Sequence, residues 1–130
     1  MGNVSQNFSR SEFRCNGIEE INCGCGRDAV DVELVNALET IRRDMAGGSP
    51  VQINSGNRCH LWNTHHKVNG SPHSQHLLGK AADFWFPRGD VDLEEVYAQM
   101  DDRWPKKYGM GLYRRFIHLD VRPLRARWLG

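Results

Sequence analysis

The sequence predicts an α+β fold, in which helices flank a mostly antiparallel sheet within a single small domain over residues 1–130. The first observation is the order of the elements: helical patterns come first, and strand and helix patterns mix afterwards. The second is size, because 130 residues with 39% hydrophobic and 25% charged side chains are typical of one globular domain. The third is that no repeat, low-complexity tract or linker divides the chain.

Three segments carry helix signals. Ser9 and Glu12 in NFSRSEF have the spacing of a capping box, which predicts a helix start there. In residues 30–45 the apolar side chains recur at spacings of three and four, as on one face of an amphipathic helix, and GGSP at 47–50 ends the pattern. The same periodicity predicts a second amphipathic helix over 92–100.

Four short segments carry strand signals. They cover residues 51–54, 80–86, 109–113 and 116–121, and the last two would form a hairpin over the two arginines between them. Side chains alternate between the two faces of a strand. In 80–86 this places Ala82, Phe84 and Phe86 on one face, opposite Ala81, Asp83 and Trp85. In 116–121 the predicted core-facing residues are Ile117, Leu119 and Val121.

Charge and hydropathy exclude several classes of protein. The net charge is +1, so nothing indicates nucleic-acid binding. No run approaches the ~18 apolar residues of a membrane span, and MGNVSQNFSR lacks a signal-peptide pattern. We therefore expect a protein that is synthesised in the cytoplasm and does not insert into a membrane, and a monomer is the default expectation. Five arginines should be mainly solvated, with binding of an anionic polymer as the minor alternative: Arg114, Arg115, Arg122, Arg125 and Arg127.

The four cysteines leave several interpretations open. Cys15, Cys23 and Cys25 are spaced C-x7-C-x-C, and Cys59 is distant. This spacing fits poorly to zinc motifs, which are built from C-x2-4-C pairs. Buried thiols are the simplest interpretation, and a structural zinc site or a disulfide formed after release are the alternatives.

The stretch SQHLLGKAAD contains two residues of a candidate metal site. His76 precedes a turn that Gly79 allows, and Asp83 follows on a strand, so both side chains could face one ion. A catalytic zinc site uses three protein ligands and leaves a position open for water. An aspartate in an apolar strand would be costly to bury without such a partner. The predicted third ligand is His118 in RFIHLDVR, and Asp120 points the same way on that strand.

These segments resemble a known protein family. SQHLLGKAAD resembles the S-x-H-x-x-G-x-A-x-D signature of the zinc D-Ala-D-Ala carboxypeptidase / L-alanyl-D-glutamate peptidase family, the LAS-type metallopeptidases. NFSRSEFRC…CGCG, INSGNRC and FIHLDVR resemble further segments of a short-form branch that includes phage endolysins. The segments occur in the family order and extend from Asn7 to Arg122.

The resemblance implies roles for individual residues. One Zn²⁺ ion would lie in a surface cleft, with three ligands: His76, Asp83 and His118. Arg58 would hold the substrate carbonyl or the developing oxyanion, which a fixed guanidinium favours. Ser74 and Gln75 would line the substrate cleft.

The general base is where this chain departs from many relatives. They have a carboxylate or a histidine two or three positions before the last ligand, where this chain has Phe116 and Arg115. Asp120, two positions after His118, is the nearest candidate for a catalytic base. The alternative is that Asp120 orients a ligand histidine.

The resemblance implies a zinc peptidase that cleaves the stem peptide of peptidoglycan. We expect an L-alanyl-D-glutamate endopeptidase, a phage endolysin that leaves the host cytoplasm to act on the cell wall or in the periplasm. One alternative is a D-Ala-D-Ala carboxypeptidase of bacterial or prophage origin. Another is a non-catalytic, zinc-containing module that binds the cell wall. A cysteine zinc knuckle for nucleic acid is disfavoured by the spacing and by the near-neutral charge.

Overall fold

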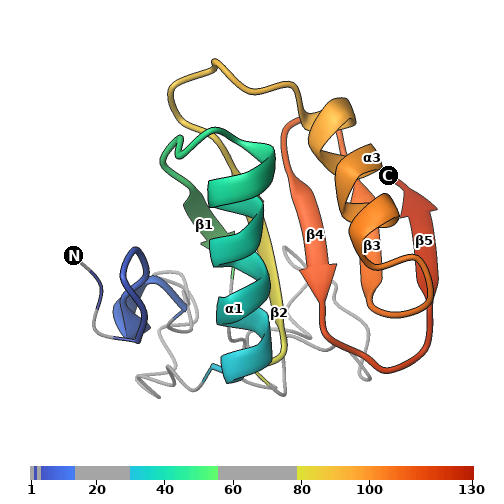
Figure 1. Ribbon diagram of the computed structural model, residues 1–130, viewed down its shortest axis with the longest axis horizontal. Helices are drawn as coiled ribbons and strands as arrows, with labels where there is room; N and C mark the ends of the chain where they lie inside the picture. The colour runs from blue at the N-terminus through green and yellow to red at the C-terminus, as the bar shows by residue number, and fades with distance from the viewer. Residues whose placement is uncertain (1, 3, 14–29, 56–78) are drawn as a thin grey trace, which may run out of the picture.

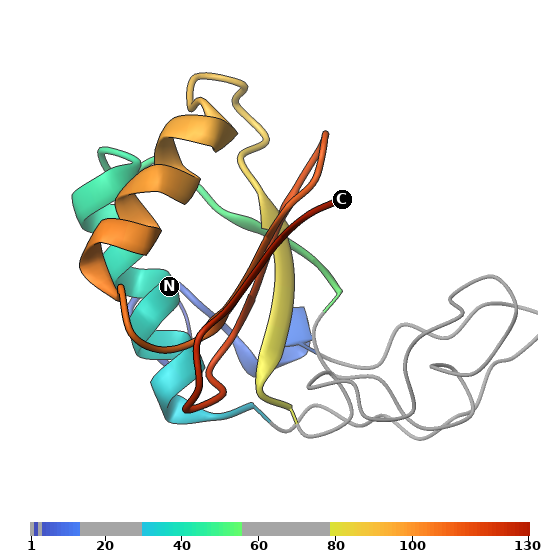
Figure 2. The same cartoon turned by 90° about the vertical axis from the view of Figure 1, so that its right-hand side faces the viewer.

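The fold is a five-stranded sheet that carries two helices on one face (Figures 1 and 2). A computed structural model describes residues 2, 4–13, 30–55 and 79–130. The strand order across the sheet is β1-β2-β4-β3-β5. The strands are β1 Gln52–Ser55, β2 Ala81–Trp85, β3 Gly109–Leu112, β4 Ile117–Asp120 and β5 Ala126–Leu129.

Four of these strands match the sequence predictions, and β5 was not predicted. The pairs β1–β2, β2–β4 and β3–β4 are antiparallel, whereas β3–β5 is parallel, so the sheet is mixed. Because β4 runs antiparallel to β3, its end lies beside the start of β3. Strand β5 can therefore pair in parallel with β3 on its other side, without a crossover helix. The segment Ala126–Leu129 lacks an alternating apolar pattern, because it forms an edge strand and none of its residues is fully buried.

Both predicted amphipathic helices are present, with bounds that differ by a few residues from the prediction. Helix α1, Val32–Thr40, is capped by Asp31, whose carboxylate accepts a hydrogen bond from the Glu33 amide at 2.8 Å. It continues as one π-helical turn, η2 Ile41–Met45, and ends where Gly47 and Gly48 take φ values of +59° and +83°. Helix α3, Leu93–Arg103, is capped in the same way by Asp92 and extends three residues beyond the predicted end.

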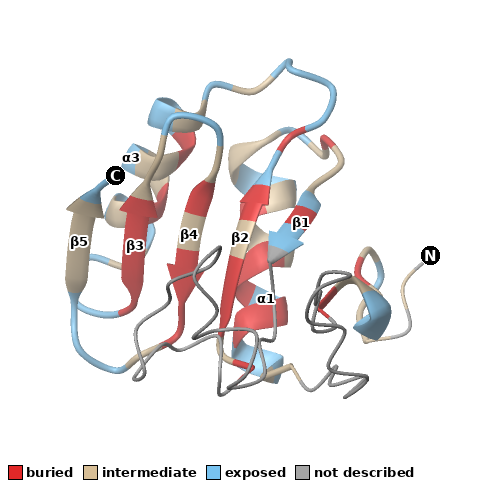
Figure 3. Ribbon diagram, turned by 180° about the vertical axis from the view of Figure 1, so that it is seen from behind, coloured by how far each residue is buried: buried red, intermediate tan, exposed pale blue. Residues whose placement is uncertain are grey.

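The hydrophobic core lies between the helices and the sheet. The predicted core face of 116–121 is confirmed, and Ala82, Phe84 and Phe86 of 80–86 join it, because all six residues are at least 94% buried and belong to one cluster. Figure 3 shows the opposite face of the sheet, which the helices do not cover. The helices contribute the other side of the core through Leu34, Leu38, Ile41, Val96 and Met100. The sheet therefore has one apolar face and one face available for polar side chains.

Three of the five arginines predicted to be mainly solvated make defined contacts. Arg127 is the most enclosed: its guanidinium binds Asp101 Oδ1 at 2.8 Å and the carbonyl oxygens of Trp104 and Tyr108 at 2.7 and 2.6 Å. Arg125 also binds Asp101, at 2.6 Å. These contacts join β5 to the end of α3, which spacing alone could not reveal. Arg122 pairs with Asp120 at 2.6 Å, while the two hairpin arginines are exposed as expected.

The N-terminal segment is held on α1 by one carboxylate. Glu39 accepts hydrogen bonds from the Ser5 hydroxyl at 2.5 Å, the Asn7 amide at 2.8 Å and the Asn7 side chain at 2.7 Å. Burial raises the pKa of Glu39, but these bonds outweigh burial and the net pKa is lowered. The segment places Phe8 and Phe13 in the core, the latter at the end of the 3₁₀ turn η1 Arg10–Phe13. Glu12 accepts from the Ser9 amide at 2.6 Å, the half of the predicted capping box that the structure describes.

We expect Glu39→Gln to lower the free energy of unfolding by about 1–2 kcal/mol near pH 7, because an amide cannot accept all three hydrogen bonds. The folded-state pKa of Glu39 lies below its reference value of 4.5, so its stabilising effect is present above about pH 4.5. That effect is lost as the pH falls through the folded-state pKa. Urea unfolding at stepwise lower pH measures this, with exposed Glu95→Gln on α3 as the control. A difference between Glu39→Gln and wild type that does not shrink in acid would contradict the assignment.

Within the described residues, no helix has the length and apolar character needed to cross a bilayer.

Candidate active site

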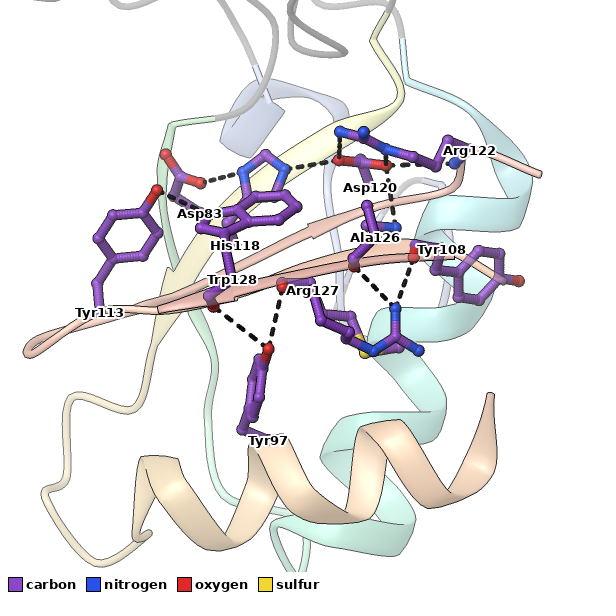
Figure 4. Close-up of polar contacts among 12 residues, drawn as sticks. Asp83, Tyr97, Tyr108, Tyr113, His118, Asp120, Arg122, Ala126, Arg127 and Trp128 are labelled. Atoms are coloured by element: carbon purple, nitrogen blue, oxygen red, sulfur yellow. Dashed lines mark hydrogen bonds and ion pairs between the residues drawn. The ribbon is translucent and has the colours of Figure 1, made fainter. Parts of the chain in front are cut away.

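One row of residues crosses the sheet on the face opposite the helices. The register pairs Asp83 of β2 with His118 of β4, His118 with Gly111 of β3, and Gly111 with Trp128 of β5. Figure 4 shows the side chains of Asp83, His118 and Trp128 gathered above the sheet, while Tyr97 of α3 approaches from below. Three strands therefore deliver side chains to one location across Gly111, because neighbouring positions in a sheet project to the same face.

His118 lies between two carboxylates. Its Nδ1 is 2.8 Å from Asp83 Oδ1, and its Nε2 is 2.8 Å from Asp120 Oδ2. The side chains of His118 and Asp83 are 12% and 19% exposed, whereas Asp120 is fully buried. Burial lowers the pKa of His118, but the hydrogen bonds with Asp120 and Asp83 outweigh burial and the net pKa is raised. Two carboxylates beside one imidazole favour a positive charge at this point of the sheet.

Asp120 has partners on both of its oxygens. The Arg122 guanidinium forms a fork, with Nε 2.6 Å from Oδ1 and Nη2 2.7 Å from Oδ2. The Gly109 amide donates to Oδ1 at 3.2 Å. Burial raises the pKa of Asp120, but the hydrogen bonds from His118 and Arg122 outweigh burial, and the net pKa lies well below that of an ordinary aspartate. The carboxylate is therefore ionised and buried, and both of its oxygens accept hydrogen bonds.

Two glycines of β3 make room for these groups. A Cβ at Gly109 would lie 2.4 Å from Asp120 Oδ2 and 2.6 Å from Arg122 Nε. A Cβ at Gly111 would lie 2.2 Å from Nε1 of Trp128, whose indole covers that position. Real Cβ atoms do not approach neighbours so closely, so the GMG sequence of β3 is what allows the carboxylate and the indole to lie against the strand.

Aromatic side chains from β5 and from the β3–β4 hairpin border the row. The rings of Trp128 and His118 have centroids 5.1 Å apart at an interplanar angle of 44°. The indole Nε1 donates to the Tyr113 hydroxyl at 2.9 Å. Tyr113 in turn stacks on Phe116, with centroids 4.4 Å apart and an interplanar angle of 10°. His118 therefore meets a fixed aromatic wall on one side.

The donor set fits part of a zinc site. An imidazole nitrogen and a carboxylate oxygen are ordinary zinc ligands, and Asp83 and His118 lie side by side. Asp120 binds the other nitrogen of the ring, so it cannot share an ion with Nδ1, and instead matches the carboxylate that orients a ligand histidine in many zinc sites. Among residues 4–13, 30–55 and 79–130, no three His, Cys, Asp or Glu side chains are arranged to hold a metal. A third ligand would have to come from elsewhere in the chain.

The structure brings together three of the residues predicted from the sequence, Asp83, His118 and Asp120. Gly79, predicted to allow the preceding turn, has a φ of +68°. The other predicted site residues and the cysteines lie outside the described residues: Arg58, Ser74, Gln75, His76, Cys15, Cys23, Cys25 and Cys59. The contacts of Arg122 and Trp128 were not predicted from the sequence. One signal in the sequence could have identified Arg122: in an extended strand, positions 118, 120 and 122 point to the same face.

Comparisons with known proteins agree with the motifs. The sequence matches the family described as Peptidase M15 over residues 6–120, which is most of the chain and includes both Asp83 and His118. No curated protein matches the chain. The chain belongs to the peptidase M15 family, the zinc D-Ala-D-Ala carboxypeptidase family.

Proposed function

We propose that this peptidase is a zinc-dependent L-alanyl-D-glutamate endopeptidase of peptidoglycan, acting as a phage endolysin after release from the cytoplasm in which it is made. The proposal includes a monomer whose single domain spans residues 1–130. The observation that carries it is the contact between Asp83 Oδ1 and His118 Nδ1 at 2.8 Å. These two residues occupy the aspartate position of S-x-H-x-x-G-x-A-x-D and the histidine of the final strand motif, within the region that matches the family.

We assign three ligands to one Zn²⁺ ion: His76, Asp83 and His118. Asp83 and His118 come from neighbouring antiparallel strands, so a rigid sheet fixes their separation. His76 is assigned from the motif, since it precedes Asp83 by seven residues with Gly79 between them. A bound zinc ion supplies Lewis-acid activation of a water molecule and of the scissile carbonyl.

The remaining assignments concern the substrate. Arg58 is proposed to hold the carbonyl oxygen on which negative charge develops, because a guanidinium provides fixed donors and a permanent charge. Ser74 and Gln75 are proposed to line the cleft that receives the stem peptide. All three residues are assigned from their place in the family motifs.

Asp120 is better suited to orient His118 than to act as the general base. A base must take up a proton during the reaction, whereas the lowered pKa of Asp120 disfavours proton uptake. It is fully buried, and each of its oxygens already accepts hydrogen bonds. A carboxylate that accepts from Nε2 leaves Nδ1 of the same ring directed at Asp83, which is the orientation that a ligand histidine needs.

Digestion of purified Gram-negative peptidoglycan by the zinc-loaded protein tests the proposal. Mass spectrometry should detect fragments with new D-glutamate amino termini, and EDTA should remove this activity until zinc is restored. Loss of only a terminal D-alanine would instead identify a D-Ala-D-Ala carboxypeptidase. If no metal-dependent product forms although the protein binds the wall, the non-catalytic binding module is the correct assignment.

A further inference from the structure

Two residues that contact the His118–Asp120 pair lie beyond the region that matches the family. That region ends at residue 120, and both Arg122 and Trp128 follow it. We propose that Arg122 and Trp128 are positioning residues, which hold the His118 ring in the orientation that a metal ligand requires. The proposal rests on the proposed zinc site, but the orientation of His118 can be measured independently of zinc.

Arg122 acts through Asp120. Its guanidinium occupies both oxygens of the carboxylate as a bidentate fork, at 2.6 and 2.7 Å, which fixes the plane of the carboxylate as well as its position. Asp120 Oδ2 then lies 2.8 Å from His118 Nε2. A buried carboxylate without its cation would be costly, so removal of the Arg122 guanidinium should make Asp120 move. That movement would release His118 Nε2.

Trp128 restricts rotation of the His118 imidazole toward β3. Its indole packs against the imidazole, with ring centroids 5.1 Å apart, and a hydrogen bond from Nε1 to the Tyr113 hydroxyl holds it in place. The indole occupies the space that Gly111 leaves empty, so it fills the side of His118 that faces β3. Rotation of the imidazole toward β3 would meet the indole, and Asp120 opposes rotation at the other end.

The two residues are also linked to each other and to the scaffold. The guanidinium carbon of Arg122 lies 5.6 Å from the centroid of the Trp128 ring, within the range of a cation–π contact. The Tyr97 hydroxyl of α3 donates toward the carbonyl oxygens of Met110 and Trp128, at 3.1 and 3.3 Å, which ties β5 to β3 from the helix side. The support of His118 therefore reaches back to α3.

If Arg122 and Trp128 only stabilised the fold, their replacement would lower stability without a specific change at His118. Arg125→Gln is the matched control, because Arg125 belongs to the same segment and pairs with Asp101, and no described contact joins it to His118. Arg122→Lys preserves the charge but not the fork, so it should rescue part of the effect of Arg122→Gln. Trp128→Phe preserves an aromatic ring, whereas Trp128→Ala removes it.

The experiment measures Zn²⁺ affinity by competition with a chelator, the visible spectrum of the Co²⁺-loaded protein, and the nitrogen shifts of His118 in metal-free protein at one fixed pH. We expect Arg122→Gln and Trp128→Ala to weaken Zn²⁺ binding by about 10-fold to 100-fold and to alter the Co²⁺ spectrum. Arg122→Lys and Trp128→Phe should lose less, and Arg125→Gln should match wild type. The shifts of His118 should change only in the variants of Arg122 and Trp128.

Zn²⁺ affinity within twofold of wild type and unchanged His118 shifts in Arg122→Gln and Trp128→Ala would overturn the proposal. Thermal unfolding of each variant identifies those that fail to fold. If Arg122→Gln or Trp128→Ala does not fold, the conservative variant at the same position, Arg122→Lys or Trp128→Phe, decides the outcome. If wild-type protein binds no Zn²⁺, the proposed function fails. The His118 shifts in metal-free protein would then still decide whether these two residues orient the ring.

Discussion

His118→Ala should abolish zinc binding and peptidase activity while leaving the sheet folded. The substitution removes the proposed ligand on β4, and the Arg122 fork remains to satisfy Asp120. A catalytic metal contributes several kcal/mol to stabilisation of the transition state, so the rate of peptidoglycan cleavage should fall by about 1,000-fold or more. The variant should lose about 1–3 kcal/mol of stability, because the buried Asp120 loses one hydrogen-bond partner.

Activity, Zn²⁺ stoichiometry and circular dichroism together test this prediction. Asp83→Asn should reproduce the loss of zinc and of activity with a smaller change in volume. Asp90→Asn is the control for loss of a carboxylate, because Asp90 lies in the loop between β2 and α3, where it binds Ser49. A folded His118→Ala protein with full activity would show that the ligand assignment is wrong.

Gly109→Ala should damage both stability and the site. The added Cβ would lie 2.4 Å from Asp120 Oδ2 and 2.6 Å from Arg122 Nε, so the buried ion pair or the strand must move. Overpacking of this kind costs about 1–3 kcal/mol, which corresponds to a decrease of about 4–12 °C in Tm for a domain of this size. Since Asp120 orients His118, Zn²⁺ affinity should fall as well.

Gly89→Ala separates this effect from the general cost of replacing a glycine. A Cβ at Gly89 meets nothing within 4 Å, but its φ of +70° disfavours alanine, so some stability should be lost, by about 1–2 kcal/mol. Zn²⁺ affinity should not change. Equal Zn²⁺ affinities in Gly109→Ala, Gly89→Ala and wild type would mean that Asp120 tolerates displacement without any effect on His118.

Much of the fold could be predicted because local periodicity determines it. The alternation in 116–121 assigned Ile117, Leu119 and Val121 to the buried face, and the alternation in 80–86 separated the apolar side chains from Asp83, since one face of the sheet is fully buried. The apolar spacing in 30–45 located α1 in the same way, although not the π turn at its end. These elements form by burying one apolar face, and the spacing of apolar residues in a single sequence indicates that face.

The residues that were missed depend on contacts between distant segments. Strand β5 pairs at one edge with β3 and is fixed by Asp101 of α3, so its sequence carries basic residues rather than an apolar alternation. Arg122 was grouped with solvated arginines, because the sequence does not show that Asp120 becomes fully buried beside it. Nor does it show that Gly111 leaves space for the Trp128 indole. Such features require the tertiary structure.

The row from Asp83 through His118 and Gly111 to Trp128 also has a consequence for folding. Each strand contributes a single position to it, so a shift of one residue between β2 and β4 would turn Asp83 toward the helices, where an unpaired charge is costly. Misaligned sheets would thus be penalised by the same polar groups that serve the native site. A zinc ion held there would bind only the correctly aligned sheet and would shift the folding equilibrium toward it. The rate at which refolding protein acquires metal affinity would then measure when the strands reach their final alignment.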